Sequence, residues 1–165
     1  MACWKEKALE KIINPNQLPR LISSLRSCGK SIATINGSFD LMHAGHLHIL
    51  YEGSKQADVL IVALNTDESI KTYKDPRRPI IPLEYRLEMM AALGFVSFVT
   101  WFHETTPCNL LKMISPDIHV NGAEYGCNCV EAEVVRKGGG ELFLVERVQG
   151  LSTSELITKI QDICV

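Results

Sequence analysis

The stretch Ser31-Ile-Ala-Thr-Ile-Asn-Gly-Ser-Phe-Asp-Leu-Met-His-Ala-Gly-His46 decides the fold of this chain. Its apolar start, rich in β-branched residues, predicts a buried strand over Ile32–Asn36, and the residues after the stretch predict a helix over Leu47–Gln56. His43 and His46 therefore fall in a turn between a strand and a helix. Such turns point free backbone N–H groups outward and the helix dipole adds a partial positive charge, so the segment predicts an anion-binding site.

Three residues of this turn suit a phosphate. Gly45 has no Cβ, so a phosphate can approach the backbone closely. His43 and His46 lie on neighbouring positions of one helical turn, and both imidazoles can donate hydrogen bonds. Two histidines near a turn also occur as surface or capping residues, so the pair alone is weak evidence of catalysis. The arrangement suits the α-phosphate of a nucleotide, where negative charge must be stabilised during transfer.

Strand and helix patterns alternate along the rest of the chain. Apolar strands separated by helices predict a parallel sheet covered on both faces, with ligands bound beyond the carboxyl ends of the strands. We expect a single-domain, doubly wound α/β fold of about five strands. The expected strands are Ile32–Asn36, Val59–Asn65, Phe95–Trp101, Ile118–Asn121 and Glu141–Val145. The expected helices are Leu47–Gln56, Leu83–Leu93, Cys108–Ile114, Val130–Lys137 and Ser154–Ile163.

Length and composition exclude several classes of protein. The 165 residues suffice for one domain with a substantial core, and 46% hydrophobic and 22% charged residues are typical of a soluble globular protein. A net charge of −2 argues against a nucleic-acid-binding surface spread over the molecule. The longest apolar run, Val59–Leu64, is too short to span a membrane, and no secretory signal is recognisable. We therefore expect a cytoplasmic protein that binds neither nucleic acid nor membrane.

The six cysteines match no zinc-binding pattern, because Cys127 and Cys129 form a lone Cys-x-Cys without a second pair. Reduced thiols are expected, some of them packed as small apolar residues. A redox or metal role for this pair stays open, and no metal ligands are predicted.

Two segments depart from the alternation of strands and helices. Residues 1–30 are expected to form a helical N-terminal extension, broken near Pro15 and Pro19, ahead of a domain over residues 31–165. Residues 72–82 form a basic, proline-rich loop to which no strand or helix is assigned. Four cations lie within residues 71–78, and we interpret the segment as a lid that brings lysine and arginine to phosphates, rather than as a solvated surface loop.

The last predicted strand leads into a second polar turn, Glu146-Arg-Val-Gln-Gly-Leu-Ser-Thr-Ser154. Ser152 and Glu155 form a capping box at the start of the last helix, which alone would explain the serine. Hydroxyl and free N–H groups at a helix start also suit the β- and γ-phosphates of a nucleotide.

These motifs together resemble the nucleotidyltransferase superfamily. The Gly-x-Phe-Asp-x-x-His-x-Gly-His pattern of residues 37–46 is similar to that of its cytidylyltransferase-like branch, and residues 147–154 resemble its second signature, Arg-x-x-Gly-x-Ser-Thr-x. Ser154 stands where many members have threonine. The resemblance implies a Rossmann-like fold and a nucleotidyl transfer reaction.

A finer resemblance, running from about residue 30 to the C-terminus, is to the adenylyltransferases that make ADP-heptose from D-glycero-D-manno-heptose 1-phosphate. It rests on the order of Asn65-Thr-Asp67, the Arg-Pro-Ile-x-Pro-Leu-Glu-x-Arg pattern ending at Arg86, Pro116-Asp117 and Val120–Tyr125. The chain resembles a stand-alone form, without the fused kinase domain of bifunctional enzymes. Asn121 stands where that subfamily usually has lysine, which affects the substrate assignment more than the reaction class.

The implied reaction is an in-line attack by a sugar-phosphate oxygen on the α-phosphorus of ATP, which releases pyrophosphate. The implied catalytic residues are His43, His46 and Lys74. The implied nucleotide-binding residues are Asn36, Gly37, Ser38, Phe39, Gly45, His46, Gly122, Glu124, Tyr125, Arg147, Ser152, Thr153 and Ser154. The implied acceptor-binding residues are Asp40, Asn65, Asp67, Lys71, Arg78 and Arg86, with structural roles left open for Asp40 and Arg86.

Magnesium is expected to bind mainly through the nucleotide phosphates, because it retains much of its water and needs few protein ligands. The resemblance also implies a homodimer. Two alternatives stay open: a glycerol-3-phosphate cytidylyltransferase or another enzyme of the same branch, and a non-catalytic nucleotide-binding protein.

Overall fold

Strand β2 (Val59–Asn65) is buried along its whole length and forms the centre of the fold. Its alternate residues belong to two apolar clusters: Leu60, Val62 and Leu64 to the first, and Val59, Ile61 and Ala63 to the second. Because successive side chains of a strand point to opposite faces, these clusters lie on opposite sides of the sheet. In the computed structural model, which describes residues 4–146 and 148–163, helices cover both faces.

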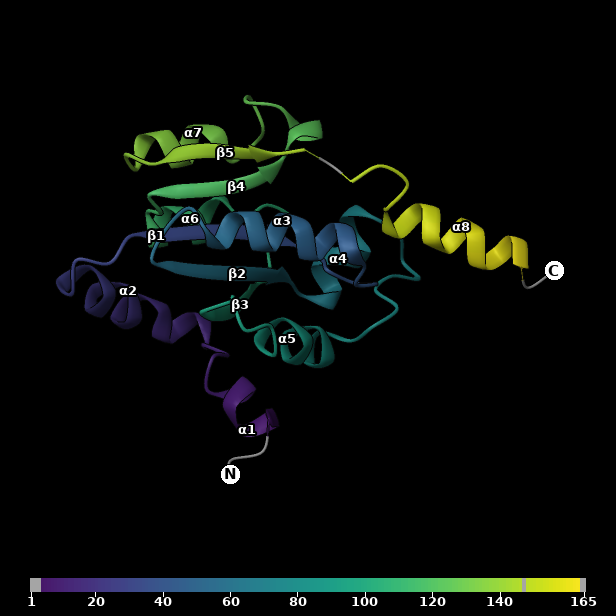
Figure 1. Ribbon diagram of the computed structural model, residues 1–165, viewed down its shortest axis with the longest axis horizontal. Helices are drawn as coiled ribbons and strands as arrows, with labels where there is room; N and C mark the ends of the chain where they lie inside the picture. Colours follow the sequence, from purple (N-terminus) through teal and green to yellow (C-terminus); the bar gives the residue numbers. More distant parts are fainter. Residues whose placement is uncertain (1–3, 147, 164–165) are drawn as a thin grey trace.

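The sheet has five strands in the order β3-β2-β1-β4-β5, and every neighbouring pair is parallel (Figure 1). The other strands are β1 (Ile32–Gly37), β3 (Phe98–Phe102), β4 (Ile118–Gly122) and β5 (Glu141–Val145). The predicted five-stranded, Rossmann-like α/β fold is confirmed. The chain leaves β1 toward β2 and returns on the other side of β1 at β4, so the carboxyl ends of β1 and β4 flank the crevice in which such sheets bind ligands.

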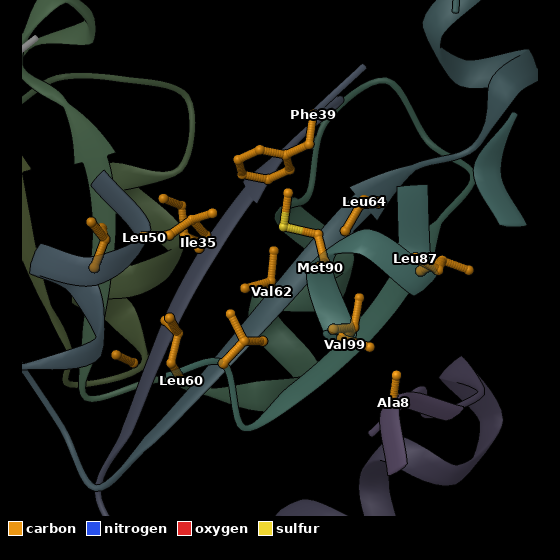
Figure 2. Close-up of a cluster of buried hydrophobic side chains, with 14 of the residues drawn as sticks. Ala8, Ile35, Phe39, Leu50, Leu60, Val62, Leu64, Leu87, Met90 and Val99 are labelled. Carbon is orange, nitrogen blue, oxygen red and sulfur yellow. The ribbon is translucent and has the colours of Figure 1, made fainter. Parts of the chain in front are cut away.

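Helices α3 (Ala44–Ser54) and α5 (Leu83–Ala91) cover the first cluster, and α2 (Leu18–Ser27) and α6 (Cys108–Ile114) cover the second. Figure 2 shows the first cluster, with Leu50 of α3 and Met90 of α5 against the side chains of the strands. The remaining helices are α1 (Trp4–Leu9), α4 (Asp67–Tyr73), α7 (Ala132–Lys137) and α8 (Thr153–Ile163), with short 3₁₀ turns η1 (Pro15–Gln17) and η2 (Ala123–Tyr125).

Helix α8 has no buried residue among those described and projects away from the sheet (Figure 1). None of the helices in the described ranges has the length and apolar character needed to cross a lipid bilayer.

The N-terminal segment is helical, as expected, and it packs on the sheet. Leu18 and Ile22 of α2 are buried in the second cluster. Between α1 and η1, the N–H of Ile13 donates to Val99 O (2.8 Å) and the N–H of Val99 donates to Lys11 O (2.9 Å), which adds a short parallel bridge beside β3. The helices are interrupted near both prolines: Pro15 begins η1, and Pro19 lies in the first turn of α2, where a missing N–H leaves no intrahelical bond unmade.

Several predicted boundaries are corrected. Helix α3 begins at Ala44 rather than Leu47, because the His43 carbonyl already accepts the N–H groups of His46 and Leu47. Strand β3 begins at Phe98 rather than Phe95 and runs to Phe102. Helix α6, by contrast, has the predicted bounds, with Pro107 at its N-cap.

Helix α4 was not predicted, although its start signal is present in the sequence. The Thr66 hydroxyl accepts the N–H of Ser69, and Asp67 and Glu68 lie in the first turn, where the helix dipole favours carboxylates. The basic segment is therefore helical as far as Tyr73, and the loop begins only at Lys74.

His119 lies on β4 with no exposed surface, and its Nδ1 is 2.8 Å from the hydroxyl of Thr34 on β1. No described residue hydrogen-bonds to its Nε2. Burial lowers its pKa from 6.5 to about 4, so the folded protein keeps this imidazole neutral where the unfolded chain would protonate it. The contribution of His119 to stability is therefore complete above pH 6.5 and is lost as the pH falls toward 4.

We expect this linkage to remove about 2 kcal/mol of unfolding free energy between pH 7.5 and pH 5.0. Urea unfolding of wild type and His119→Asn at the two pH values measures it. The asparagine retains an amide that can pair with Thr34 but does not titrate, so the variant should lose about 2 kcal/mol less than wild type. Equal losses in the two proteins would show that His119 does not carry the effect.

Candidate active site

A cleft of about 560 Å³ opens at the carboxyl ends of the strands. Residues at the ends of β1, β2, β4 and β5 line it, together with the start of α3, the end of α4, the segment between β3 and α6, and the turn that leads into α8. The cleft therefore occupies the crevice beside β1 and β4 that the strand order predicts.

The two histidines of the turn after β1 stack on each other in this cleft. His43 has extended backbone and occupies the N-cap position of α3, whereas His46 lies in the first helical turn. Their ring centroids are 3.8 Å apart with an interplanar angle of 27°. Gly45 makes this stack possible, because a Cβ there would lie 3.0 Å from Cε1 and Nδ1 of His43.

Phe39 supports the histidines from the core side. Its ring is buried and meets the His46 ring edge-on, with 5.3 Å between centroids. Its backbone has φ of +44°, in the left-handed region that is unfavourable for a residue with a Cβ. Backbone strain of this kind persists where the surroundings fix a residue in place, and it clusters at functional sites.

His46 is neutral in the ligand-free protein. Burial, then the neighbouring His43, then Lys74 lower its pKa from 6.5 to about 4. Its Nδ1 is buried without a hydrogen-bond partner among the described residues. An anion bound in the cleft would favour the protonated ring, because it would supply the opposite charge that the site lacks.

Lys74 follows directly after α4 and reaches the same space. Its Nζ donates a 2.8 Å hydrogen bond to Ser38 Oγ at the end of β1. Loss of hydration and the nearby cations Arg78 and Arg86 lower the pKa of Lys74, and Asp40 opposes them. A phosphate here would meet an ammonium group that is already in place.

The start of α8 brings hydroxyl groups to the same cleft. Ser152 caps the helix as predicted, because its Oγ accepts the N–H of Glu155 (3.1 Å). Ser152, Thr153 and Ser154 all line the cleft. Arg147, predicted to bind the same phosphates, lies outside the described residues.

The structure gathers the predicted catalytic and nucleotide-binding residues into this cleft. Apart from Arg147, all of them line it: Asn36, Gly37, Ser38, Phe39, His43, Gly45, His46, Lys74, Gly122, Glu124, Tyr125, Ser152, Thr153 and Ser154. They come from four separate segments of the chain, which sequence spacing alone cannot bring together.

The predicted acceptor-binding residues are mostly placed elsewhere. Of the six, Asn65 lines the cleft, and its Nδ2 donates to Ser69 Oγ (3.0 Å). Asp40 is buried, and its carboxylate accepts the N–H groups of Ile80 and Ile81 and pairs with Arg78. These contacts brace the loop, which is one of the two roles left open for Asp40.

Arg86 is also fully buried and binds only protein groups. Its guanidinium donates to the carbonyls of Ser38, Asn65 and Ile81 and forms a 2.6 Å ion pair with Asp67. The geometry therefore assigns Arg86 a structural role. Lys71 is exposed on α4, and neither it, Asp67 nor Arg78 is among the residues that line the cleft.

The cleft also contains residues that were not predicted as part of the site. They are Ile35, Ile49, Tyr73, Thr105, Thr106, Pro107, Asn121, Val130, Glu131, Val145, Glu146, Val148 and Leu151. Thr105 to Pro107 follow β3, so the rule that ligands bind beyond the carboxyl ends of strands would have found them. No sequence signal singles out Glu131.

The described residues contain no group of three or more histidine, cysteine or acidic side chains that could hold a metal ion.

Comparison with known proteins agrees with this geometry. The family model described as cytidylyltransferase-like matches residues 34–159. Two curated relatives are named Bifunctional protein HldE: one from Ectopseudomonas mendocina is 38% identical over 98% of this chain, and one from Campylobacter fetus subsp. fetus is 43% identical over 92%. The chain spans about a third of the length of these relatives, 34% and 31% respectively.

Two solved structures share the fold. The lipopolysaccharide core biosynthesis protein from Thermoplasma volcanium has a TM-score of 0.59 and 28% identity, covering 73% of this chain and 98% of its own. The pantoate-beta-alanine ligase from Francisella tularensis, solved with beta-gamma ATP and beta-alanine, has a TM-score of 0.60 and covers 93% of this chain and 78% of its own. At 13% identity, the second similarity concerns the fold alone.

Proposed function

This chain belongs to the cytidylyltransferase-like family of nucleotidyltransferases, and we propose that it transfers AMP from ATP to D-glycero-D-manno-heptose 1-phosphate, giving ADP-heptose and pyrophosphate. The observation that carries the proposal is the stacked pair of His43 and His46 inside a cleft at the carboxyl ends of β1 and β4. Lys74 and the hydroxyls at the start of α8 line the same cleft. Groups of this kind suit a row of phosphates.

In the proposed reaction, an oxygen of the sugar phosphate attacks the α-phosphorus of ATP while the bond to the β-phosphate oxygen breaks. Both reactants are polyanions, so the protein mainly has to position them and neutralise charge. His43 and His46 would donate hydrogen bonds to the α-phosphate as its charge changes. Lys74 would stabilise the same region, and the hydroxyls of Ser152, Thr153 and Ser154 would hold the β- and γ-phosphates that leave as pyrophosphate.

The choice of a sugar phosphate as acceptor is supported by the comparisons. The Thermoplasma volcanium protein is named a lipopolysaccharide core biosynthesis protein, and the relatives from Ectopseudomonas mendocina and Campylobacter fetus share the name HldE. The nucleotide is expected to bind as its magnesium complex, in which the ion neutralises phosphate charge. The homodimer stays a prediction.

Pyrophosphate release by the purified protein with Mg²⁺ tests the proposal, with ATP and CTP each combined with heptose 1-phosphate and glycerol 3-phosphate. We expect turnover with ATP and heptose 1-phosphate and at least about 100-fold lower kcat/KM for the other three pairs, since a site that hydrogen-bonds its substrate rejects analogues lacking those groups. Turnover with CTP and glycerol 3-phosphate instead would support nucleotidyl transfer but would contradict ATP and heptose 1-phosphate as its substrates. If the protein binds ATP but releases no pyrophosphate in any of the four mixtures, a non-catalytic nucleotide-binding protein would be favoured.

A further inference from the structure

Glu131 is a buried carboxylate that lines the cleft, with 8% of its surface exposed. No hydrogen bond or ion pair joins its side chain to any other residue of the described chain. It stands at the N-cap position of α7, yet its side chain makes no capping hydrogen bond. Asp40, the other buried carboxylate near the cleft, has three partners. Packing and capping therefore explain Asp40 but leave Glu131 without a structural role.

Most of the Glu131 side chain is buried, and its carboxylate oxygens remain open to the cleft without a partner in the described chain. A group that lacks partners in the free protein and lines a binding cleft is suited to accept them from a ligand. The ligand group cannot be a phosphate, because two anions repel each other. A neutral hydrogen-bond donor, such as a hydroxyl of a sugar, suits it.

The surroundings of Glu131 place it on one particular wall of the cleft. Cys108 Sγ, at the start of α6, lies 3.6 Å from the carbonyl oxygen of Val130, so the segment before α7 adjoins the segment after β3. That second segment is tied to the end of β2, because Ser69 Oγ donates to Glu104 O (2.7 Å) and accepts from Asn65 Nδ2 (3.0 Å). The resulting polar wall consists of Asn65, Thr105, Thr106 and Glu131.

Three residues of this wall lie apart from β5 in the strand order. Asn65 follows β2, and Thr105 and Thr106 follow β3, whereas the hydroxyls of Ser152 to Ser154 follow β5. In an in-line displacement the attacking group approaches from the side opposite the leaving group. We therefore expect the acceptor beside Asn65, Thr105 and Thr106, which adjoin the segment of Glu131.

We propose that the Glu131 carboxylate accepts hydrogen bonds from hydroxyl groups of the acceptor sugar phosphate and thereby determines which acceptor is used. This inference rests on the proposed nucleotidyl transfer and extends it, since it assigns an acceptor-recognition residue that no motif indicates. A carboxylate can bind two neighbouring hydroxyls of a ring at once, whereas a short acyclic alcohol offers fewer groups in a fixed arrangement.

The test uses Glu131→Gln and Glu131→Ala in the full chain, with Glu133→Gln as the matched control. Glu133 lies two residues further along α7, is exposed, and pairs with Lys137. With ATP saturating, the Glu131 variants should raise KM for heptose 1-phosphate by about 10- to 100-fold, as expected for loss of hydrogen bonds to a charged group. Their KM for ATP should stay within about twofold of wild type, as should both constants of Glu133→Gln.

Thermal unfolding without substrate provides a second readout that does not depend on turnover. Because the wild-type carboxylate has no partner within the described chain, Glu131→Gln breaks no hydrogen bond and should unfold at the same or a higher temperature. A lower unfolding temperature would identify Glu131 as a structural residue and overturn the inference. A raised KM for ATP in place of the acceptor, or unchanged constants, would also overturn it. An inactive wild type would reject the proposed function. The unfolding temperatures would still show whether Glu131 has a structural role.

Discussion

Replacing His46 by alanine should lower kcat for nucleotidyl transfer by about 10²–10³-fold, the usual effect of removing one well-placed donor from a site of developing charge. The ring lies in the cleft, stacked on His43 and supported by the edge of Phe39. The low pKa of His46 keeps the ring neutral in the free site, and a bound phosphate would favour the protonated, positively charged ring. Pyrophosphate release at saturating ATP and acceptor measures the change.

His48→Ala is the matched control for this experiment, because His48 lies on the same helix but is exposed. Its kcat should remain within about twofold of wild type, as for most surface substitutions. Circular dichroism should show both variants folded. If His46→Ala weakened only ATP affinity and left turnover of bound substrate unchanged, His46 would be a binding residue and the transfer mechanism would be wrong.

Arg86→Met should be the most destabilising of these substitutions, at about 3–5 kcal/mol of unfolding free energy, as is typical when one partner of a buried ion pair is removed. Methionine retains an unbranched side chain of similar start but is shorter and cannot donate. The carbonyls of Ser38 and Asn65 would lose their donor from Arg86, and Asp67 would lose its cation. Urea unfolding at pH 7.5 measures the loss.

Two companion variants make that result specific. Arg77→Met removes a guanidinium that is 86% exposed and pairs only with its neighbour Asp75 among the described residues, so no measurable loss is expected. Arg86→Lys retains the charge without the planar fork that reaches several acceptors at once, and should recover only part of the stability. A wild-type-like midpoint for Arg86→Met would show that the network is not needed for folding.

The sequence predicts this fold well where one local signal is sufficient. Strands β2 and β5 have the predicted bounds, because continuous apolar runs ended by polar residues mark buried strands. Helix α4 was missed because its seven residues merge with a basic segment and carry few apolar positions, although Thr66 is a recognisable cap. The start of α3 was missed because Gly45 is a poor helix former.

The candidate site likewise contains residues that the sequence predicts and residues that it does not. The phosphate-binding groups could be predicted, because histidines and hydroxyls at the starts of helices carry a local motif. The roles of Asp40 and Arg86 could not, since their partners lie up to 48 residues away and only the folded chain brings them together. Glu131 has no motif at all. It is identified by burial without a partner, a property that exists only in three dimensions.

The backbone bridge between residues 11–13 and Val99 affects how this protein can be shortened. A chain beginning at residue 31 would contain all five strands, but β3 would become an open sheet edge with unpaired N–H and C=O groups. It would also uncover the apolar surface on which Leu18 and Ile22 pack. An open strand beside exposed apolar surface is a template for edge-to-edge association. Residues 11–22 therefore cover both this edge of the sheet and the apolar surface beside it.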